Sequence, residues 1–502
     1  MSDNILVFNT KKNKYIFDNV SGNVIPYNEM DEFIIRNYFE FDKEKLINEL
    51  KERFNKEEEK IIASYSYISD LINLGYFYNA SLIEGLDLET SLKKMPMAQL
   101  ILILTEDCNL RCKYCVFSEQ YPNIKTYSNK VMDFETAKLA IDEYISLYND
   151  KVKYGYRKKP IISFYGGEPF LNFNVMKRVI DYCNDCNYDV KYYATTNGTI
   201  MTDEIIDYIT NNDFSITFSI DGHKEQHDRN RVFSNDVESF DKVYENISKL
   251  QQYKKAKGIM QSISISCTYD DYSDFKKITD FFIDNYDMLF PFYIIFNKVS
   301  EFDTNYYSFC DEMHEKNLIK ESKQESVDSY RELFEHFKND SLNYKEVKIL
   351  KFLFSSLNII NNRPKGAMGL WGGVCLPSNK IAVAPDGNYY VCERVNQKFK
   401  IGDIYSGLNL ERCSDLFNKY LNIINENCKG CNISRLCEKC YMHFIQDEST
   451  LKFNSTFCNN RKKTMPRVLG NLYEVLEVNP NILKNDLASN DEKFFELLQV
   501  IK

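Results

Sequence analysis

Three cysteines stand close together in the first third of the chain. Cys108, Cys112 and Cys115 form a C-x3-C-x2-C array that follows an apolar run at residues 99–104. Cysteine thiolates are the usual protein ligands of iron–sulfur clusters, and three in one loop can bind three irons of a [4Fe–4S] cluster. The fourth iron would then stay open to a small-molecule ligand. The alternative is a structural zinc knuckle, which normally needs a fourth protein ligand, and no histidine or fourth cysteine lies near the array.

A second group of cysteines lies in the C-terminal third. Cys375 is followed by eleven residues, Gly387, four more residues and Cys392. After a gap come Cys428, Cys431, Cys437, Cys440 and Cys458. Seven thiols at this density are too many for core packing, and their grouping suits two more [4Fe–4S] sites. A tandem zinc module is the alternative for this region.

Short polar motifs follow several other apolar runs. The pair Gly166 and Gly167 lets the backbone approach a ligand without Cβ obstruction, and Glu168 could accept a hydrogen bond from an ammonium group. Arg231 could hold a carboxylate through charge-assisted hydrogen bonds. Short polar side chains that suit ribose and carboxylate groups are Thr195, Thr196, Asn197 and Ser219.

Alternating strands and helices must position these motifs. The predicted strands lie at residues 99–105, 160–167, 189–197, 214–221, 261–269 and 291–296. Helical stretches lie between them, and six βα units indicate parallel strands in an open, partial barrel. The chemistry of such barrels sits at the C-terminal strand ends, which is where the motifs fall.

The rest of the chain predicts smaller units. Three short apolar runs separated by turn residues, and then three helices, predict an α+β domain at residues 1–85. Residues 301–374 are predicted to form a helical bridge, and residues 466–502 to form packing helices.

Composition limits the function. The chain has 502 residues, a formal charge of −10 and 15 cysteines. The acidic balance argues against nucleic-acid binding through phosphate neutralisation. No apolar run is long enough to span a membrane. An odd cysteine count without a signal peptide argues for a reducing cytoplasm, with thiolates used as metal ligands.

The cysteine loop resembles that of the radical S-adenosylmethionine (SAM) superfamily, because aromatic Tyr114 precedes its last cysteine and a GGEP motif follows the next strand. The resemblance implies a partial (β/α)6 barrel over residues 99–300, within the α/β class. It also implies a cluster on Cys108, Cys112 and Cys115, with SAM on its open iron. The residues expected to contact SAM are Tyr114, Gly166, Gly167, Glu168, Thr196, Asn197, Ser219 and Arg231.

The C-terminal cysteines at residues 375–465 resemble a SPASM domain, which holds auxiliary clusters. The pattern fits at all seven cysteines, except that two rather than three residues separate Cys437 from Cys440. The resemblance implies three [4Fe–4S] clusters in total. Auxiliary cluster I would use Cys375, Cys392 and Cys440, and auxiliary cluster II would use Cys428, Cys431, Cys437 and Cys458. A substrate thiolate or Cys413 could complete auxiliary cluster I.

The order of elements in residues 1–85 resembles the winged-helix-like leader-peptide recognition element of peptide-modifying enzymes, with an ordinary packing module as the alternative. Together these resemblances imply a 5′-deoxyadenosyl radical and modification of a cysteine-containing ribosomal peptide, with thioether cross-linking preferred. The alternatives are formylglycine formation by an anaerobic sulfatase-type maturase, carbon–carbon cross-linking, and a non-catalytic iron–sulfur scaffold. The expected partners are a precursor peptide with a leader and an electron donor such as flavodoxin or ferredoxin. The sequence does not identify the general base.

Overall fold

The computed structural model describes two compact units of the chain. The described residues are 4–77, 97–121, 126–153, 155–259, 262–301, 304–338, 342–353, 375–395, 397–437, 439–447 and 450–480. One unit takes the described residues among Asp87–Leu353 and Cys375–Phe417, and the other takes those among Met1–Leu86 and Asn418–Asn485. Each unit combines helices with a sheet, and the predicted α/β class is confirmed.

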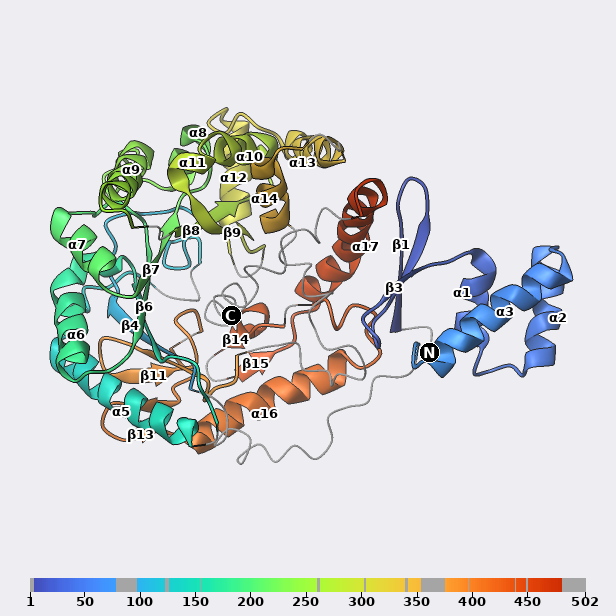
Figure 1. The fold of residues 1–502 in the computed structure, drawn as a ribbon, viewed down its shortest axis with the longest axis horizontal. Coiled ribbons are helices and arrows are strands. Elements are labelled where there is room, and N and C mark those ends of the chain that lie inside the picture. Colours follow the sequence, from blue (N-terminus) through green and yellow to red (C-terminus); the bar gives the residue numbers. More distant parts are fainter. Residues whose placement is uncertain are drawn as a thin grey trace. The chain divides into compact units, whose positions relative to one another are not determined.

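Six neighbouring parallel strands form the centre of the larger unit (Figure 1). They are β4 (Gln99–Thr105), β5 (Ile161–Gly166), β6 (Lys191–Thr196), β7 (Phe214–Ser219), β8 (Ile263–Tyr269) and β9 (Pro291–Lys298). All six predicted strands are present in the predicted order, with ends that differ by two residues at most. This arrangement confirms the partial barrel, since the sheet is open between its first and last strands.

The two faces of these strands differ in chemistry because successive side chains point to opposite sides. Ile162, Tyr192 and Phe214 share one row across three strands, and Phe164 stacks on Tyr192 with ring centroids 6.1 Å apart. Helices lie along one side of this sheet (Figure 1). The opposite face carries polar rows, one of which joins Thr195, Thr217 and Ser264.

Helices connect the strands, and some of them start at side-chain caps. Asp133 accepts from Thr136 N at 2.7 Å, and Asp274 accepts from Lys277 N at 3.0 Å, so each satisfies an otherwise unpaired amide of a first helical turn. The helices of the barrel region are α5 (Phe134–Val152), α6 (Phe173–Asp185), α7 (Asp203–Asn211), α8 (Lys224–Asn230), α9 (Phe240–Ala256), α10 (Phe275–Asp284) and α11 (Tyr286–Leu289), with a 3-10 turn, η2 (Pro169–Asn172). Three more follow β9: α12 (Tyr306–Glu315), α13 (Lys323–Phe337) and α14 (Tyr344–Leu353).

Four short strands from the cysteine-rich region extend the same sheet. They are β10 (Lys380–Val383), β11 (Asn388–Tyr390), β12 (Gly402–Asp403) and β13 (Gly407–Leu408). Strand β10 pairs in parallel with β4, and β10 to β13 are mutually antiparallel. The segment that carries Cys375 and Cys392 is therefore built onto the edge of the barrel sheet.

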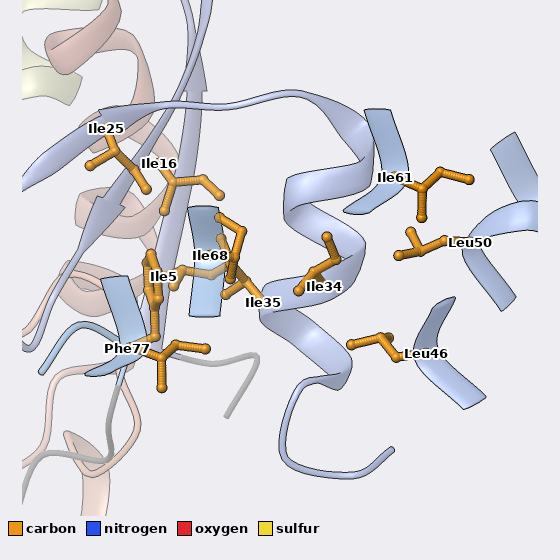
Figure 2. Close-up of a cluster of buried hydrophobic side chains, with 11 residues drawn as sticks. Ile5, Ile16, Ile25, Ile34, Ile35, Leu46, Leu50, Ile61, Ile68 and Phe77 are labelled. Atoms are coloured by element: carbon orange, nitrogen blue, oxygen red, sulfur yellow. The ribbon is translucent and has the colours of Figure 1, made fainter. Parts of the chain in front are cut away.

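The smaller unit holds the predicted N-terminal fold. Strands β1 (Ile5–Asn9), β2 (Lys14–Asp18) and β3 (Val24–Pro26) form an antiparallel sheet. Helices α1 (Glu29–Asn37), α2 (Lys43–Phe54) and α3 (Glu58–Asn73) follow. Figure 2 shows the buried isoleucines and leucines that join them, including Ile16, Ile34 and Ile68.

C-terminal residues complete this smaller unit. Helix α17 (Ser455–Val478) contacts β1, and Leu6 and Phe17 share a buried cluster with Ile433 and Leu469. Arg435 donates from Nε to the Asn19 carbonyl at 3.0 Å and from Nη2 to the Val20 carbonyl at 2.6 Å. The N-terminal sheet is therefore covered by helices on one side and by the cysteine-rich segment on the other.

The remaining elements are α16 (Leu410–Asn427), the 3-10 turn η4 (Tyr441–His443), β14 (Ile445–Asp447) and β15 (Thr450–Lys452). Parts of three predicted segments, residues 78–85, 354–374 and 481–502, lie outside the described residues. The predicted domain bounds stay a prediction. Within the described residues, no helix combines the length and apolar character that crossing a membrane requires.

Candidate functional site

The three-cysteine loop directly follows β4 at the C-terminal end of the parallel strands. Cys108 and Cys112 are buried, and Cys115 is partly exposed. They pack together with Leu110, Tyr127 and Phe233. Burial raises the pKa of the Cys108 thiol, and the charges of Glu168 and Cys112 raise it further. The loop therefore gathers three thiols in a partly dry pocket that favours thiolates only when a positive group, such as iron, compensates them.

A glycine pair holds the next loop against this one. A Cβ on Gly167 would lie 2.0 Å from the Asp107 carbonyl oxygen, and a Cβ on Gly166 would lie 2.3 Å from the Thr105 carbonyl oxygen. Two backbone hydrogen bonds join the loops at this contact. Gly167 N donates to Thr105 O at 2.9 Å, and Glu168 N donates to Asp107 O at 3.0 Å. We expected the glycines to admit a ligand, whereas the contact that requires them is to the backbone of the cysteine loop.

Glu168 is a buried carboxylate with three hydrogen-bond donors. It accepts from Asn197 N at 2.7 Å, from Thr196 Oγ1 at 2.8 Å and from Phe170 N at 3.1 Å. Burial raises the pKa of Glu168 to about 7, and these donors oppose the rise. The carboxylate is thus oriented and costly to ionise, which suits a site that receives a cation.

Asn197 and Thr196 lie at the end of β6, beside the same loops. The Asn197 side-chain amide donates to Asn109 Oδ1 at 2.9 Å and to Cys108 Sγ at 3.6 Å. Thr196 uses its hydroxyl on Glu168. Their observed contacts are therefore to the cysteine loop and to the carboxylate, and direct contact with SAM stays a prediction for both.

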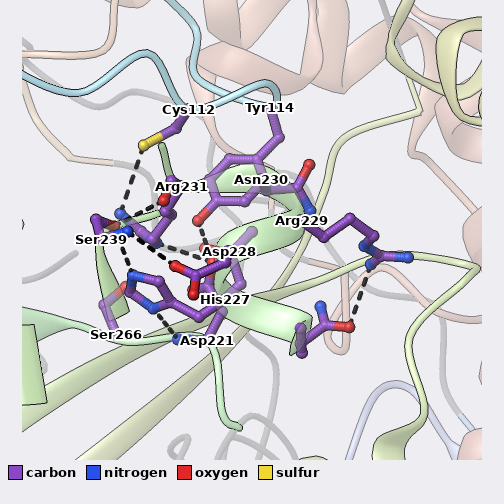
Figure 3. A network of polar contacts seen from close by, with 12 residues as sticks. Cys112, Tyr114, Asp221, His227, Asp228, Arg229, Asn230, Arg231, Ser239 and Ser266 are labelled. Atoms are coloured by element: carbon purple, nitrogen blue, oxygen red, sulfur yellow. Dashed lines mark hydrogen bonds and ion pairs between the residues drawn. The ribbon is translucent and has the colours of Figure 1, made fainter. Parts of the chain in front are cut away.

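Arg231 lies at the centre of a buried polar network (Figure 3). Its Nε donates to Asp221 Oδ2 at 2.8 Å, and the Tyr114 hydroxyl donates to the same oxygen. Its Nη1 lies 3.9 Å from Cys112 Sγ. Ser219, which ends β7, is buried two residues before Asp221. Two of the three donor nitrogens of Arg231 are thus directed at protein groups, which leaves Nη2 for the predicted carboxylate contact.

Four of the C-terminal cysteines share one neighbourhood in the smaller unit. Burial raises the pKa of Cys428 to about 11, Lys439 opposes the shift, and the other three thiols raise it further. The four are Cys428, Cys431, Cys437 and Cys458. They are the residues predicted to bind auxiliary cluster II.

The remaining predicted ligands are Cys375, Cys392 and Cys440, all partly exposed. Cys375 and Cys392 belong to the larger unit and Cys440 to the smaller one. Cys413, the alternative ligand, is fully buried in α16, where its thiol contacts the Pro377 carbonyl at 3.6 Å. Burial raises the pKa of Cys413 to about 12, with no contribution from another described cysteine.

A zinc ion and an iron–sulfur cluster make different demands on the positions of their ligands. Zinc needs donors that converge on one point at about 2.0–2.3 Å. Across the described ranges, no group of three or more ligating side chains converges closely enough to hold a single metal ion. Each thiolate of a cubane binds a different iron, so its ligands can stand further apart.

Sequence reasoning gave no role to three contributors to this site. Asp221 accepts a hydrogen bond from Arg231, and Asn109 accepts one from Asn197. Tyr127 interacts with the Cys115 thiol. Asp221 stands in the motif that contains Ser219, and Asn109 lies inside the cysteine loop, so their positions in the sequence could have indicated them. Tyr127 carries no such signal.

Comparisons with known proteins agree with this geometry. The family model of the Radical SAM superfamily matches residues 102–265. The uncharacterised protein MJ0907 of Methanocaldococcus jannaschii is 43% identical over 128 residues, which are 25% of this chain and 39% of that protein. A cysteine-type anaerobic sulfatase-maturating enzyme of Clostridium novyi is 28% identical over 68% of this chain and 86% of its own. The structure of native anSMEcpe with bound AdoMet and a peptide has the same fold, with a TM-score of 0.53, 19% identity and coverage of 76% of this chain and 99% of that one.

Proposed function

Because this chain is a radical SAM enzyme, we propose that it modifies a cysteine-containing ribosomal peptide by forming a thioether cross-link. The observation that carries the proposal is the presence of two separate thiol sites. One is the three-cysteine loop after β4, and the other is the group around Cys428. A chain that only cleaved SAM would need the first site alone.

Cys108, Cys112 and Cys115 are the proposed ligands of the SAM-site cluster. When bound, this cluster and SAM supply a 5′-deoxyadenosyl radical that removes a hydrogen atom from the substrate. The protein positions both groups. Glu168 offers a fixed carboxylate for the amino group of SAM, and Gly166 and Gly167 keep its loop against the cysteine loop. Tyr114, Thr196, Asn197, Ser219 and Arg231 are the other residues proposed for this pocket.

The C-terminal cysteines are proposed to bind two auxiliary clusters. Cys428, Cys431, Cys437 and Cys458 would hold auxiliary cluster II, which their shared neighbourhood supports. Cys375, Cys392 and Cys440 would hold auxiliary cluster I. At the fourth iron of that cluster we propose a substrate thiolate, which has the required chemistry. Cys413, whose thiol contacts the Pro377 carbonyl, is the alternative ligand.

The N-terminal sheet is the proposed leader-binding element. Strand β3 pairs only with β2 among the described strands, so its other edge can accept a peptide strand. The element 1–85 would then bring the precursor peptide to the enzyme. An electron donor such as flavodoxin or ferredoxin and a cytoplasmic location complete the proposal.

Formylglycine formation is the second candidate, supported by the similarity to sulfatase-maturating enzymes over most of their length. About a quarter of this chain has no counterpart in the structure of anSMEcpe, which is matched almost completely. This additional chain favours a substrate other than that of a sulfatase maturase. Carbon–carbon cross-linking is the third candidate.

The test uses the anaerobically reconstituted full-length protein, SAM, a reductant and the short peptides encoded beside its gene. We expect 5′-deoxyadenosine and a peptide product that is two hydrogen atoms lighter than the substrate. The product should also have one fewer free thiol, measured by alkylation with iodoacetamide. A product that has lost two hydrogens but keeps every thiol would indicate a carbon–carbon bond. An aldehyde that reacts with a hydrazide probe would instead indicate formylglycine.

SAM binding should depend on the ionisation of Glu168. Its pKa is raised to about 7 by burial, so the free carboxyl is largely protonated below that pH and cannot pair with the cationic amino group. We expect SAM affinity to rise with pH up to about 7 and then level off, and to fall about tenfold per pH unit below it. Calorimetric titration from pH 6 to pH 8.5 measures this.

Glu168→Gln is the control for that experiment. The amino group of SAM titrates identically in both proteins, so the ratio of their affinities isolates Glu168. An equal pH dependence in the wild type and in Glu168→Gln would contradict the assignment.

A further inference from the structure

Arg231 brings a buried positive charge to the cysteine loop. Its side chain is 9% exposed, and that of its partner Asp221 is 0% exposed. The Nη1 of Arg231 reaches Cys112 Sγ at 3.9 Å, and the guanidinium carbon lies 5.3 Å from the centre of the Tyr114 ring. The charge thus lies against one of the three thiols proposed to bind the SAM-site cluster.

Asp221 fixes this guanidinium in place. Its Oδ1 accepts from Thr268 N at 2.8 Å, and its Oδ2 accepts from Arg231 Nε and from the Tyr114 hydroxyl. Because Tyr114 belongs to the cysteine loop, this carboxylate ties the loop and the arginine to the ends of β7 and β8. A neutral asparagine at this position could not accept as strongly from three donors.

The rest of the network includes one more carboxylate, that of Asp228, which accepts from Ser239 N at 2.9 Å and from Phe240 N at 2.8 Å (Figure 3). His227 Nδ1 lies 3.4 Å from Asp221 N, its Nε2 lies 3.1 Å from Ser239 Oγ, and Ser239 donates to the Arg231 carbonyl at 2.7 Å. Burial lowers the pKa of His227 well below its usual value, and Arg231 lowers it further. Of the charged residues in this network, Arg231 and Asp221 are the two that act on Cys112.

A second ion pair of the same composition lies nearby. Its tyrosine, Tyr306, packs edge-on against Tyr114, but among the described residues neither Arg229 nor Asp270 has a hydrogen bond or ion pair to the cysteine loop. Arg229 Nη2 donates to both Asp270 oxygens at 2.9 Å, and the Tyr306 hydroxyl donates to Asp270 at 2.5 Å. The Asp270 side chain is 0% exposed, and that of Arg229 is 14% exposed. This pair matches the first in residue types and burial, so it is an internal control.

Electrostatics gives these two charges opposite effects on a cluster held by Cys112. A reduced cluster carries one more negative charge than an oxidised one. A nearby cation stabilises the reduced form, a nearby anion destabilises it, and low local dielectric strengthens both effects. The two charges also have opposite effects on the Cys112 thiol. Burial raises the pKa of Cys112 to about 12, Arg231 lowers this pKa, and Asp221 raises it.

We infer that Arg231, oriented by Asp221 and Tyr114, is a positioning residue that sets the reduction potential of the SAM-site cluster through Cys112. This inference rests on the proposed cluster ligands. It gives Arg231 a role that does not require SAM, in contrast to the expected carboxylate contact, which would act only when SAM is bound.

The test measures the midpoint potential of the SAM-site cluster without SAM, by redox titration followed by electron paramagnetic resonance in the reconstituted full-length protein. The relevant signal is the one that changes when SAM is added. At a fixed potential, Arg231→Gln should lower the ratio of reduced to oxidised cluster about tenfold, a shift of about 59 mV to more negative potential. Asp221→Asn should raise that ratio about tenfold.

Arg229→Gln and Asp270→Asn are the matched controls, and neither should move the potential. Opposite shifts in the first pair with no shift in the control pair support the inference. Shifts of the same sign, absent shifts, or equal shifts in the controls overturn it. If only Arg231→Gln fails to retain iron, the potential of Asp221→Asn is the test: a higher ratio of reduced to oxidised cluster supports the inference, and an unchanged or lower ratio overturns it. Loss of iron from both variants of the first pair but not from the controls would indicate a purely structural role and also overturn it.

A wild-type protein without any SAM-sensitive signal would instead refute the proposed function. SAM affinity is measured on the same samples. If Arg231→Gln weakens SAM binding but leaves the SAM-free potential unchanged, the arginine is a SAM ligand and the inference is wrong.

Discussion

Replacing Cys112 by alanine is expected to abolish SAM cleavage to 5′-deoxyadenosine. The loop supplies only three thiols, so losing one leaves two irons of a cubane without a protein ligand. Activity should fall by at least about a thousandfold, because no other group can supply the radical. If three clusters are bound, iron content should fall by about one third. Chromatography of deoxyadenosine and an iron assay measure both effects.

Cys183→Ala is the matched control for this substitution. Cys183 is fully buried in α6 and has no proposed role as an iron ligand. The variant should retain its iron and its activity despite a small packing defect. Deoxyadenosine formation at the wild-type rate by Cys112→Ala would show that the SAM-site cluster is assigned to the wrong thiols.

Replacing Gly167 by alanine is expected to have the second largest effect. The new Cβ would overlap the Asp107 carbonyl oxygen, which it would approach to 2.0 Å. A backbone carbonyl cannot rotate away as a flexible side chain can, so the two loops must separate. We expect a loss of about 3 kcal/mol of stability and poor loading of the SAM-site cluster. Melting temperature and the SAM-sensitive resonance signal measure these effects.

Gly258→Ala separates this clash from the general cost of removing a glycine. Gly258 has φ +68°, and a Cβ added there would meet no heavy atom of the described residues within 4 Å. Its substitution should cost about 1 kcal/mol through backbone strain alone and leave the cluster intact. Similar cluster loading in Gly167→Ala and Gly258→Ala would contradict the contact between the loops.

The barrel could be predicted from the sequence because its signals are local. Buried parallel strands are short apolar runs, and each run here ends at a polar or glycine-containing motif. Helix starts are local signals as well: the Asp42 side chain caps α2, accepting from Lys45 N at 2.8 Å. The order of three strands and three helices at the N-terminus could be predicted for the same reason.

Contacts between distant parts of the chain could not be predicted in this way. The Arg435 side chain donates a hydrogen bond to the Asn19 carbonyl in the turn after β2, although more than four hundred residues separate the two. The glycine pair could be identified as a site of close approach, but not the carbonyl groups that it approaches. The ion pair between Arg231 and Asp221 could not be predicted, because ten residues separate the two and no periodic pattern joins them.

The contact of Arg435 with Asn19 and Val20 limits how this enzyme can be recombined with others. A Cβ on Gly22 would lie 3.1 Å from Arg435 Cδ, and Asn19 Nδ2 donates to Ser434 Oγ at 2.8 Å, so the two segments are fitted to each other. Grafting a foreign N-terminal region onto this chain would leave the guanidinium without its acceptors, between Cys431 and Cys437. Chimeras that replace the N-terminal region should therefore exchange the loop around Arg435 together with the first 77 residues.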